Sequence, residues 1–467
     1  MTISSPSQGS TVAIAGGGLA GLAAGCALSS AGFRVTLFER RPYLGGRASS
    51  YQHPGTGEIV DNCQHVLFGC CTNLIEFYRR IGVEKNIRWS DTMTFVEPGG
   101  RTSVLKQSFL PAPLHTVPSF LSFPFLDARD KIAIARAMAA LIPIPLRDTG
   151  ESFLNWLHRH GQTENAIARF WNPVLVSALS EDLDLVSVSY AAQVVRESLK
   201  SETARRMGIP SIPLTDLYRS ADEYIRARGG DIRFRVGVES FRAQTSEVSV
   251  VANGQEEKFD YLLLAVPFDV LARLLPDSPA AAPLAQMLSH FETSPITGIH
   301  LWFDRQITSL DHAVLLDRTI QWMFHKSKLI EARENGNGSY VELVVSSSKS
   351  LIEKSRGEIV DLAVRELGEF FPVVREAKLV KSTVIKEVHA TYSPRPGVDD
   401  YRPRPETAWP RVFLAGDFVA TGWPATMEGA VRSGYQAAES LAKVSGVREA
   451  KFLVPDLPGS GFMRSAG

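Results

Sequence analysis

The chain has 467 residues, of which 44% are hydrophobic and 21% are charged, as in a globular protein with a large buried core. Its formal net charge at pH 7 is zero, so we expect no nucleic acid and no strongly acidic partner. The four cysteines, Cys26, Cys63, Cys70 and Cys71, have the spacing of neither a zinc site nor a disulfide framework, which indicates a reducing compartment and no metal site.

A nucleotide-binding pattern begins the chain. Residues Thr11–Ala15 predict a short buried strand, a glycine-rich turn follows at residues 16–21, and a helix of small residues runs to about Gly32. A second predicted strand, residues 33–38, ends at Glu39, which would accept hydrogen bonds from an adenosine ribose. Strand, glycines, helix, strand and acidic residue in this order are the fingerprint of dinucleotide binding. The alternative is a glycine-rich turn with a structural role only.

Each position in the turn has a physical reason. Gly16 permits the tight turn, Gly18 lets the backbone approach a pyrophosphate, and Gly21 lets the helix and the strand pack together. Leu19 and Ala20 stand in the first turn of the helix. The N–H groups and the positive potential of that turn suit phosphate oxygens.

The stretch from residue 105 to residue 146 is rich in Phe, Leu, Ile and Pro. Residues 117–126 are apolar but broken by proline, residues 127–136 carry interleaved charges, and residues 137–146 are apolar again. This pattern suits an apolar substrate channel or a surface that dips into a membrane. An ordinary hydrophobic core segment explains it equally well.

A third pattern lies near the C-terminus. Residues 411–415 predict a strand that ends at Gly416 and Asp417, and residues 422–430 begin a long helix. The N-terminus of such a helix stabilises negative charge on a bound group. Glu428 lies in the first turn of this helix, where an acidic side chain is favourable without any catalytic role.

Together these segments resemble the flavin amine oxidase and phytoene desaturase superfamily, whose members continue from the ribose-binding Glu into a Gly-Gly-Arg turn. The matching residues are Arg40, Gly46 and Arg47. The resemblance implies FAD as the cofactor, with Arg47 near the pyrophosphate, although a solvated surface arginine is the alternative. It also implies that Val238 contacts the adenine through its backbone, and that the ribityl chain and the flavin ring lie against Gly416, Asp417, Thr426 and Met427.

The same resemblance implies an α/β fold, with a discontinuous Rossmann-type FAD-binding domain and an inserted α+β substrate-binding domain. Residues 229–238 and 259–267 predict further strands of the FAD-binding domain in the middle of the chain. The FAD-binding domain is expected at residues 9–84, 216–289 and 376–447, the substrate-binding domain at residues 85–215 and 290–375, and a C-terminal tail at residues 448–467.

Two further stretches, DNCQHVLFGCC at residues 61–71 and PITGIHLWFD at residues 295–304, resemble one branch of the superfamily. That branch comprises the bacterial hydroxysqualene dehydroxylases, also called squalene-associated FAD-dependent desaturases. The segment WPATME at residues 423–428 is similar too, and the resemblance covers nearly the whole chain. It implies reduction of hydroxysqualene to squalene by reduced FAD in hopanoid biosynthesis. The apolar triterpene substrate would be handed over by a squalene-synthase-like enzyme.

Candidate active-site residues follow from the same comparison. Flavin amine oxidases often carry a lysine near the flavin on the strand that matches residues 297–303, and its absence there weighs against an amine oxidase. His65 and His300 are the candidate proton donors, and each can equally be a structural histidine. The candidates for lining the substrate pocket are Trp302, Tyr392 and Trp423, with ordinary core packing as the alternative.

Two other functional classes stay open. A carotenoid-type desaturase would remove hydride from a polyene precursor, in the opposite redox direction. The superfamily fold also occurs in prenyl-protein escort proteins, which are carriers without enzymatic activity. The complete set of Glu39, Arg47, Gly416 and Asp417 argues against the carrier.

The sequence predicts a cytoplasmic protein that associates peripherally with the membrane. Residues 1–10 are polar and show no secretory signal, and no apolar run reaches the roughly 20 residues that span a bilayer. A triterpene dissolves in the bilayer, so the enzyme must take it from lipid, and residues 105–146 are the expected contact. No cysteine or histidine stands in a flavin-attachment context, so FAD is expected to bind non-covalently.

Overall fold

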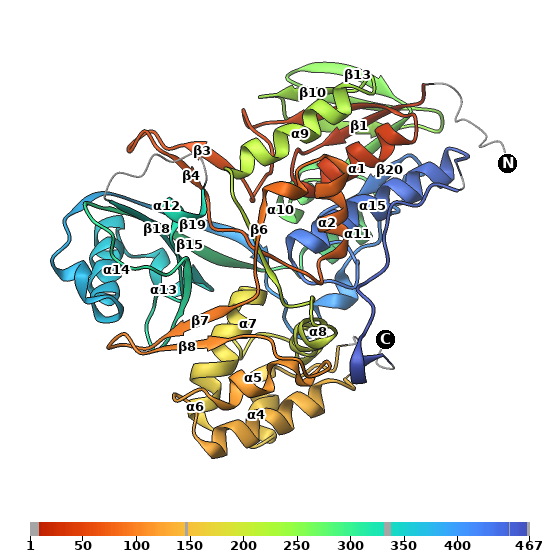
Figure 1. The fold of residues 1–467 in the computed structure, drawn as a ribbon. Helices are drawn as coiled ribbons and strands as arrows, with labels where there is room; N and C mark the ends of the chain where they lie inside the picture. The colour runs from red at the N-terminus through yellow and green to blue at the C-terminus, as the bar shows by residue number, and fades with distance from the viewer. Residues whose placement is uncertain (1–8, 145–147, 331–337, 448, 465–467) are drawn as a thin grey trace.

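The structure is a computed structural model that describes residues 9–144, 148–330, 338–447 and 449–464. A parallel sheet with its helices, a larger and mainly antiparallel sheet, and a group of helices pack against one another (Figure 1). This arrangement confirms the predicted α/β class with an inserted α+β part. No helix among the described residues is long and apolar enough to cross a membrane.

The parallel sheet has the strand order β10-β2-β1-β14-β20. Its strands are β1 (Thr11–Ala15), β2 (Arg34–Glu39), β10 (Asp231–Phe234), β14 (Tyr261–Leu264) and β20 (Val412–Leu414). The central strand β1 pairs in parallel with both β2 and β14, and its residues from Val12 to Ala15 are at most 1% exposed. Parallel strands that are buried on both faces require short continuous apolar runs, which these segments supply.

Four helices accompany this sheet: α1 (Leu19–Ser30), α2 (Thr72–Arg80), α9 (Leu214–Arg226) and α15 (Met427–Val444) (Figure 1). Helices α1 and α15 touch at Gly434, where a Cβ would lie 2.2 Å from the carbonyl oxygen of Ala20. Because Gly434 stands about two turns into α15, this contact fixes the start of α1 near the start of α15. A small antiparallel sheet lies beside them, formed by β11 (Val238–Ala243), β12 (Val248–Ala252) and β13 (Gln255–Phe259).

The larger sheet has the order β19-β15-β18-β17-β16-β7-β8. Its strands are β7 (Met93–Val96), β8 (Thr102–Leu105), β15 (Thr293–Phe303), β16 (His312–Leu315), β17 (Trp322–Phe324), β18 (Ser339–Ser346) and β19 (Leu379–Tyr392). Helix α14 (Arg356–Phe370) packs its apolar residues Ile359, Ala363 and Leu367 against β15 and β18. Short elements complete this region: α10 (Phe268–Leu274), α11 (Ala282–Leu288), α12 (Lys326–Leu329) and α13 (Lys349–Ile352).

Strand β19 corrects one expected boundary. It lies within residues 376–447, the third segment expected for the FAD-binding domain, yet it pairs along most of its length with β15. Cross-strand pairing over so many residues places it firmly in the larger sheet. The chain rejoins the parallel sheet only at β20, so the boundary falls after Tyr392.

Five short strands, β3 (Ser50–Gln52), β4 (Ile59–Asp61), β5 (Leu67–Phe68), β6 (Ile87–Ser90) and β9 (Met207–Pro210), form two small sheets outside the large ones. The helical group consists of α3 (Val117–Leu121), α4 (Ala128–Leu141), α5 (Phe153–Arg159), α6 (Glu164–Ala166), α7 (Asn172–Leu179) and α8 (Val188–Leu199). A π-helical turn, Ile167–Trp171, precedes α7.

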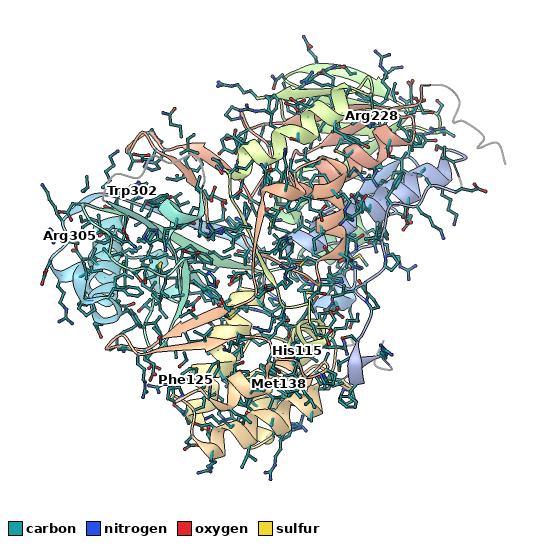
Figure 2. All side chains as sticks on the ribbon, in the orientation of Figure 1. His115, Phe125, Met138, Arg228, Trp302 and Arg305 are labelled. Atoms are coloured by element: carbon teal, nitrogen blue, oxygen red, sulfur yellow. The ribbon has the colours of Figure 1, made fainter. Side chains whose placement is uncertain are left out.

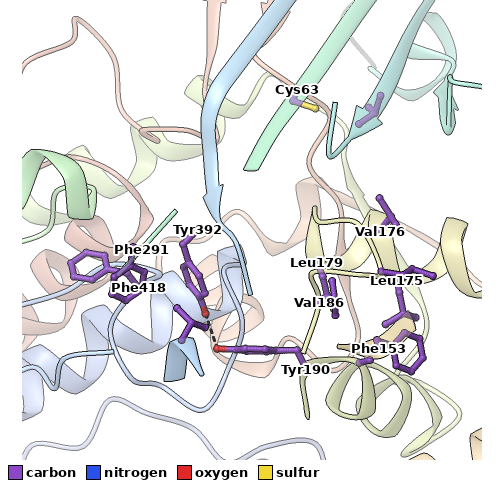
Figure 3. Close-up of a cluster of buried hydrophobic side chains, with 14 of the residues drawn as sticks. Cys63, Phe153, Leu175, Val176, Leu179, Val186, Tyr190, Phe291, Tyr392 and Phe418 are labelled. Carbon is purple, nitrogen blue, oxygen red and sulfur yellow. Dashed lines mark hydrogen bonds between the residues drawn. The ribbon is translucent and has the colours of Figure 1, made fainter. Parts of the chain in front are cut away.

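The apolar run of residues 105–146 divides between core and surface. Phe123, Phe125 and Leu126 are buried in the cluster that continues under α5, α7 and α8, part of which Figure 3 shows. By contrast, Phe109 is 97% exposed and Leu121 is 56% exposed. The run is therefore partly ordinary core, as one of the alternatives held, and partly an exposed apolar surface. Residues 145–147, at its end, lie outside the described residues.

Candidate cofactor site and active site

The glycine turn after β1 packs so closely against neighbouring backbone that side chains would not fit at Gly16 and Gly21. Gly16 has φ = +109°, and a Cβ there would lie 2.4 Å from the carbonyl oxygen of Ala265. A Cβ at Gly21 would lie 2.0 Å from the carbonyl oxygen of Gly16. At Gly18, the nearest atom to such a Cβ is the Cα of Gly46, 3.9 Å away. The turn is thus closed on the sheet side and open along Gly18, as a phosphate-binding turn requires.

The N-terminus of α1 suits an anion. Gly18 is the N-cap residue, no side chain caps the helix, and its first turn, with the buried Leu19 and Ala20, contains no acidic residue. Intrahelical bonding starts with the N–H of Leu22, which donates to the carbonyl oxygen of Gly18. The earlier N–H groups and the positive end of the helix dipole are therefore suited to a diphosphate.

Glu39 organises the loops around this turn. Its side chain is buried, its Oε2 accepts from the N–H of Gly17 at 2.7 Å, and its Oε1 accepts from the N–H of Arg41 at 2.7 Å. Arg41 in turn donates to the carbonyl oxygen of Gly46 at 2.9 Å, whereas Arg40 is exposed. The carboxylate therefore joins the glycine turn to the Gly-Gly-Arg turn. Arg41 was not among the residues predicted to bind the cofactor.

Val238 and Asp417 lie near Glu39 and the Gly-Gly-Arg turn, respectively. Just before β11, the N–H of Val236 donates to the carbonyl oxygen of Glu39 at 3.0 Å, which places the half-buried Val238 near the end of β2. Arg47 forms an ion pair with Asp417, its Nη2 lying 2.6 Å from Oδ1. Gly416 has φ = +149°, and its N–H donates to Ser433 of α15 at 2.8 Å.

The beginning of α15 is a capped helix terminus. Thr426 is the N-cap residue, its Oγ1 accepts from the N–H of Gly429 at 3.1 Å, and Met427 follows half-buried. Glu428 is fully buried and accepts from the backbone N–H of Leu74 at 2.8 Å and from Nε of Arg432 at 2.6 Å. These contacts give Glu428 a structural role, since they bind α15 to the N-terminus of α2.

The chemistry of these groups fits a dinucleotide that carries a ribose, a diphosphate and a second polyol chain. The open glycine turn and the uncapped α1 suit the diphosphate, the Glu39 carboxylate suits ribose hydroxyls, and Arg47 supplies a fixed positive charge. The structure brings together the predicted cofactor residues from six separate segments, around the starts of α1 and α15.

His65 lies in the loop between β4 and β5. Its Nδ1 lies 2.7 Å from the carbonyl oxygen of Cys63, so Nδ1 carries the hydrogen and Nε2 is the basic nitrogen. Burial lowers the pKa of His65 below its usual value, and the positive charges of Lys326 and Arg47 lower it further, against the opposing effects of the Cys63 carbonyl and Asp61. The imidazole is therefore neutral at pH 7 and suited to accept a proton.

His300 lies on β15 with its side chain buried. Its Nδ1 is 2.8 Å from the hydroxyl of Tyr340 on β18, and its Nε2 lies 3.7 Å from where a Cβ of Gly298 would stand. Gly298 itself faces the backbone of Asn62. The middle of β15 thus approaches the loop that carries His65.

A buried ion cluster that the sequence did not reveal lies beside this loop. Lys326 of α12 is 2% exposed, and its Nζ lies 2.6 Å from Oδ2 of Asp61, 2.7 Å from Oε1 of Gln64 and 3.3 Å from Oε2 of Glu342. Glu342, on β18, is fully buried. Lysine is strongly hydrophilic, and no local pattern distinguishes Lys326 from the exposed Lys328 two residues later.

The three candidate pocket aromatics do not line one pocket. Tyr392 is 1% exposed, and its hydroxyl hydrogen-bonds to that of Tyr190 at 3.0 Å (Figure 3). Trp302 stacks on Tyr340 with ring centroids 4.3 Å apart, near Arg305 at the edge of the molecule (Figure 2). Thr293 pairs with Tyr392 at the opposite end of β15, about 30 Å from Trp302 at 3.3 Å per residue.

Trp423, the third aromatic, is 8% exposed and packs with Cys70 and Ala204. The guanidinium of Arg432 lies 4.8 Å from its ring centroid. Since Arg432 also binds Glu428, Trp423 belongs to the structure that supports the start of α15. The contacts of Tyr392 and Trp423 favour core packing, which was the alternative for each, whereas Trp302 is half-buried near one end of β15.

Comparison with known proteins gives the family. Residues 19–442 match the family model for flavin-containing amine oxidoreductases. The chain is 29% identical to a 15-cis-phytoene desaturase of Synechococcus elongatus over 92% of its length and 95% of the relative. It is 27% identical to a zeta-carotene desaturase of Synechocystis sp., over 92% of this chain and 96% of the relative.

Solved structures agree in fold. A putrescine oxidase matches with a TM-score of 0.71 at 18% identity, over 92% of this chain and 98% of that one. An oxidoreductase from Methanosarcina mazei matches with a TM-score of 0.69 at 19% identity, over 91% of this chain and 98% of that one. Taken with the glycine turn, Glu39 and the Arg47–Asp417 pair, the family match leads to one conclusion: the chain belongs to the flavin-containing amine oxidoreductase family, and its cofactor is FAD.

Proposed function

We propose that the protein is an FAD-dependent oxidoreductase that acts on a long apolar isoprenoid chain. The observation that carries the proposal is its similarity, over more than nine-tenths of its length, to desaturases named for phytoene and zeta-carotene. Both of those substrates are apolar polyenes.

The site supports hydrogen removal as the first candidate reaction. Bound FAD accepts or donates a hydride equivalent. Desaturation removes a hydride and a proton from neighbouring carbons, so the protein must accept the proton. His65 is neutral, presents Nε2 as the basic nitrogen, and lies within electrostatic range of Arg47, whose partner Asp417 belongs to the cofactor site. We assign His65 the role of proton acceptor in this direction.

Reduction of hydroxysqualene to squalene is the second candidate reaction. The stretches at residues 61–71 and 295–304 favour it, because they resemble the dehydroxylase branch. In this direction a hydride forms the new C–H bond, the C–O bond breaks, and the hydroxyl leaves as water after taking a proton. His65 would have to be protonated before it could act as that acid. His300 is more enclosed, so we rank it second.

One substrate panel separates the two reactions. Purified holoprotein is incubated without oxygen with phytoene, squalene or hydroxysqualene, with its flavin oxidised or reduced. A desaturase with oxidised flavin yields new conjugated double bonds. A dehydroxylase with reduced flavin turns hydroxysqualene into squalene, and in heavy water one deuterium enters at the former carbinol carbon, because the transferable hydrogen exchanges with solvent. Absence of both reactions would refute the proposed function.

We also propose that FAD is bound non-covalently. Burial raises the pKa of Cys63 well above its usual value, and a neighbouring thiol and burial do the same for Cys70. Burial raises the pKa of Cys26 to about 12. These thiols stay protonated and are poor nucleophiles toward a flavin.

An exposed apolar patch supports docking on a membrane. It consists of Phe109, Leu114, Leu121 and Phe462, of which Phe109 is 97% and Phe462 is 71% exposed. The backbone N–H of Phe462 donates to the carbonyl oxygen of Ala112 at 2.8 Å, so the C-terminal segment lies against the loop that carries Phe109 and Leu114. Exposed aromatic side chains that gather in this way are typical of surfaces that enter lipid.

The patch makes a testable prediction. The double variant Phe109→Ser/Phe462→Ser is expected to lose most of its binding to neutral phospholipid vesicles in flotation. Binding of the unaltered protein should persist in high salt, because it is driven by apolar burial and the net charge is zero. The control is Val380→Ser/Val388→Ser, which removes exposed apolar side chains from β19 instead. Equal flotation of the two double variants would refute the assignment.

A further inference from the structure

The Lys326 cluster places three charged side chains where water does not reach them. Lys326 is 2% exposed, and the side chains of Asp61 and Glu342 are 7% and 0% exposed. Moving such groups out of water costs several kcal/mol for each ion, and their mutual attraction only partly offsets this. A neutral packed core would hold the same elements together at lower cost. The cluster is therefore a candidate for a role beyond stability.

Lys326 is connected to His65 through hydrogen bonds. Its Nζ donates to Oε1 of Gln64 at 2.7 Å, and Nε2 of Gln64 donates to the carbonyl oxygen of His65 at 3.0 Å. On the other side, Nζ donates to Asp61, whose Oδ1 accepts from Ser50 at 2.5 Å. Both ends of the segment from residue 61 to residue 65 are thus fixed by one ammonium group.

The same segment is tied to the cofactor turn. The N–H of Asn62 donates to the carbonyl oxygen of Ser49 at 2.9 Å, and the N–H of Ser49 donates to Oδ1 of Asn62 at 3.3 Å. Ser49 Oγ donates to the carbonyl oxygen of Gly46, beside Arg47. The position of His65 relative to the Gly-Gly-Arg turn is therefore set by contacts that Lys326 supports.

We propose that Lys326 is a positioning residue that fixes the Gln64–His65 segment beside the cofactor turn and, as a buried positive charge, adds to the effect of burial in keeping the His65 imidazole neutral and able to accept a proton. The role of His65 in the reaction rests on the proposed function. The effect of Lys326 on His65 is a property of the protein alone and can be measured without substrate.

The charges around the cluster agree with this role. The groups that face Glu342 are Lys326 of α12, Asp61 at the end of β4, Cys63 and the Gln64 backbone in the loop, and His300 opposite it on β15. Burial raises the pKa of Glu342 to about 7. Burial acts in the same direction on Asp61, but Lys326, together with the hydrogen bond from Ser50, brings the pKa of Asp61 below its usual value. Below pH 7, where His65 titrates, Glu342 is largely protonated. The positive charge of Lys326 is therefore compensated mainly by the carboxylate of Asp61.

The experiment follows the His65 pKa by NMR in protein labelled at the histidine ring carbons, with the His65→Asn variant to assign the signal. Lys326→Met is expected to raise the His65 pKa by about one pH unit, because a nearby like charge is removed. Asp61→Asn is expected to lower it, since the attracting carboxylate is lost while the positive charge of Lys326 remains. Lys326→Arg should retain the low value.

Lys349→Met is the matched control, because Lys349 also pairs with a fully buried carboxylate, that of Glu181, but is absent from the contacts of His65. The pKa of His65 in Lys349→Met should match that in the unaltered protein. Opposite shifts in Lys326→Met and Asp61→Asn cannot arise from general loosening of the fold. If Lys326→Met does not fold, Asp61→Asn decides alone, and an unchanged or raised His65 pKa in that variant overturns the proposal. If the His65 pKa shifts as expected but the protein converts neither phytoene, squalene nor hydroxysqualene, only the proposed function is refuted.

Discussion

Replacing Glu428 by alanine is expected to lower the free energy of unfolding by about 3–5 kcal/mol, as is typical when one partner of a buried ion pair is removed. Glu428 is fully buried, and its loss would leave Arg432 paired with Asp456, whose side chain is 45% exposed. The N–H groups of Asn73 and Leu74, at the start of α2, would also lose their acceptor. Urea unfolding of the holoprotein measures the effect.

Glu439→Ala is the matched control for this prediction. Glu439 stands on the same helix and accepts from the backbone N–H groups of Phe452 and Leu453 at 2.6 and 2.8 Å, but it binds no buried arginine. We expect Glu439→Ala to lower the free energy of unfolding by about 1–2 kcal/mol, the usual cost of unsatisfied buried donors. Equal losses in the two variants would contradict the analysis. Because Glu428 acts structurally, the activity of Glu428→Ala per bound flavin should be retained.

Local patterns predicted the cofactor FAD and the strand, turn and helix proposed to hold it, because these features depend on short segments of sequence. Gly16 is required by its positive φ and Gly21 by close packing, and Glu39 follows at the distance that a βαβ unit imposes. Asp417 could be recognised for the same reason, since it directly follows a strand of the same parallel sheet.

The active-site surroundings could not be predicted in this way, because they depend on contacts between distant residues. Lys326 and Asp61 are 265 positions apart, and nothing in the sequence around either residue indicates that they form a buried pair. Trp302 and Tyr392 were grouped as pocket residues by residue type, yet β15 separates them. The apolar stretch at residues 105–146 was ambiguous because core and membrane surfaces use the same residues.

Replacing Glu39 by alanine is expected to produce the largest loss of FAD affinity. The carboxylate accepts from the N–H groups of Gly17 and Arg41, so it shapes the phosphate-binding turn before the cofactor arrives. The family resemblance implies that it would also accept from ribose hydroxyls. Hydrogen bonds to a charged group contribute about 1.5–3 kcal/mol each, and the loss of about 3 kcal/mol raises Kd roughly a hundredfold. Glu39→Gln keeps the shape of the side chain without its charge, and its affinity for FAD should fall roughly tenfold.

Asp260→Ala separates this effect from general damage to the sheet. Asp260 accepts from the backbone N–H and the hydroxyl of Thr11, at the opposite end of β1, and thus supports the same strand away from the turn. Flavin content after dilution, followed by the fluorescence of released FAD, measures retention in all three variants. We expect Asp260→Ala to keep its flavin while Glu39→Ala releases it. Flavin that stays attached to Glu39→Ala after acid denaturation would contradict non-covalent binding, and equal release from Asp260→Ala would show that Glu39 acts through the sheet rather than through the cofactor.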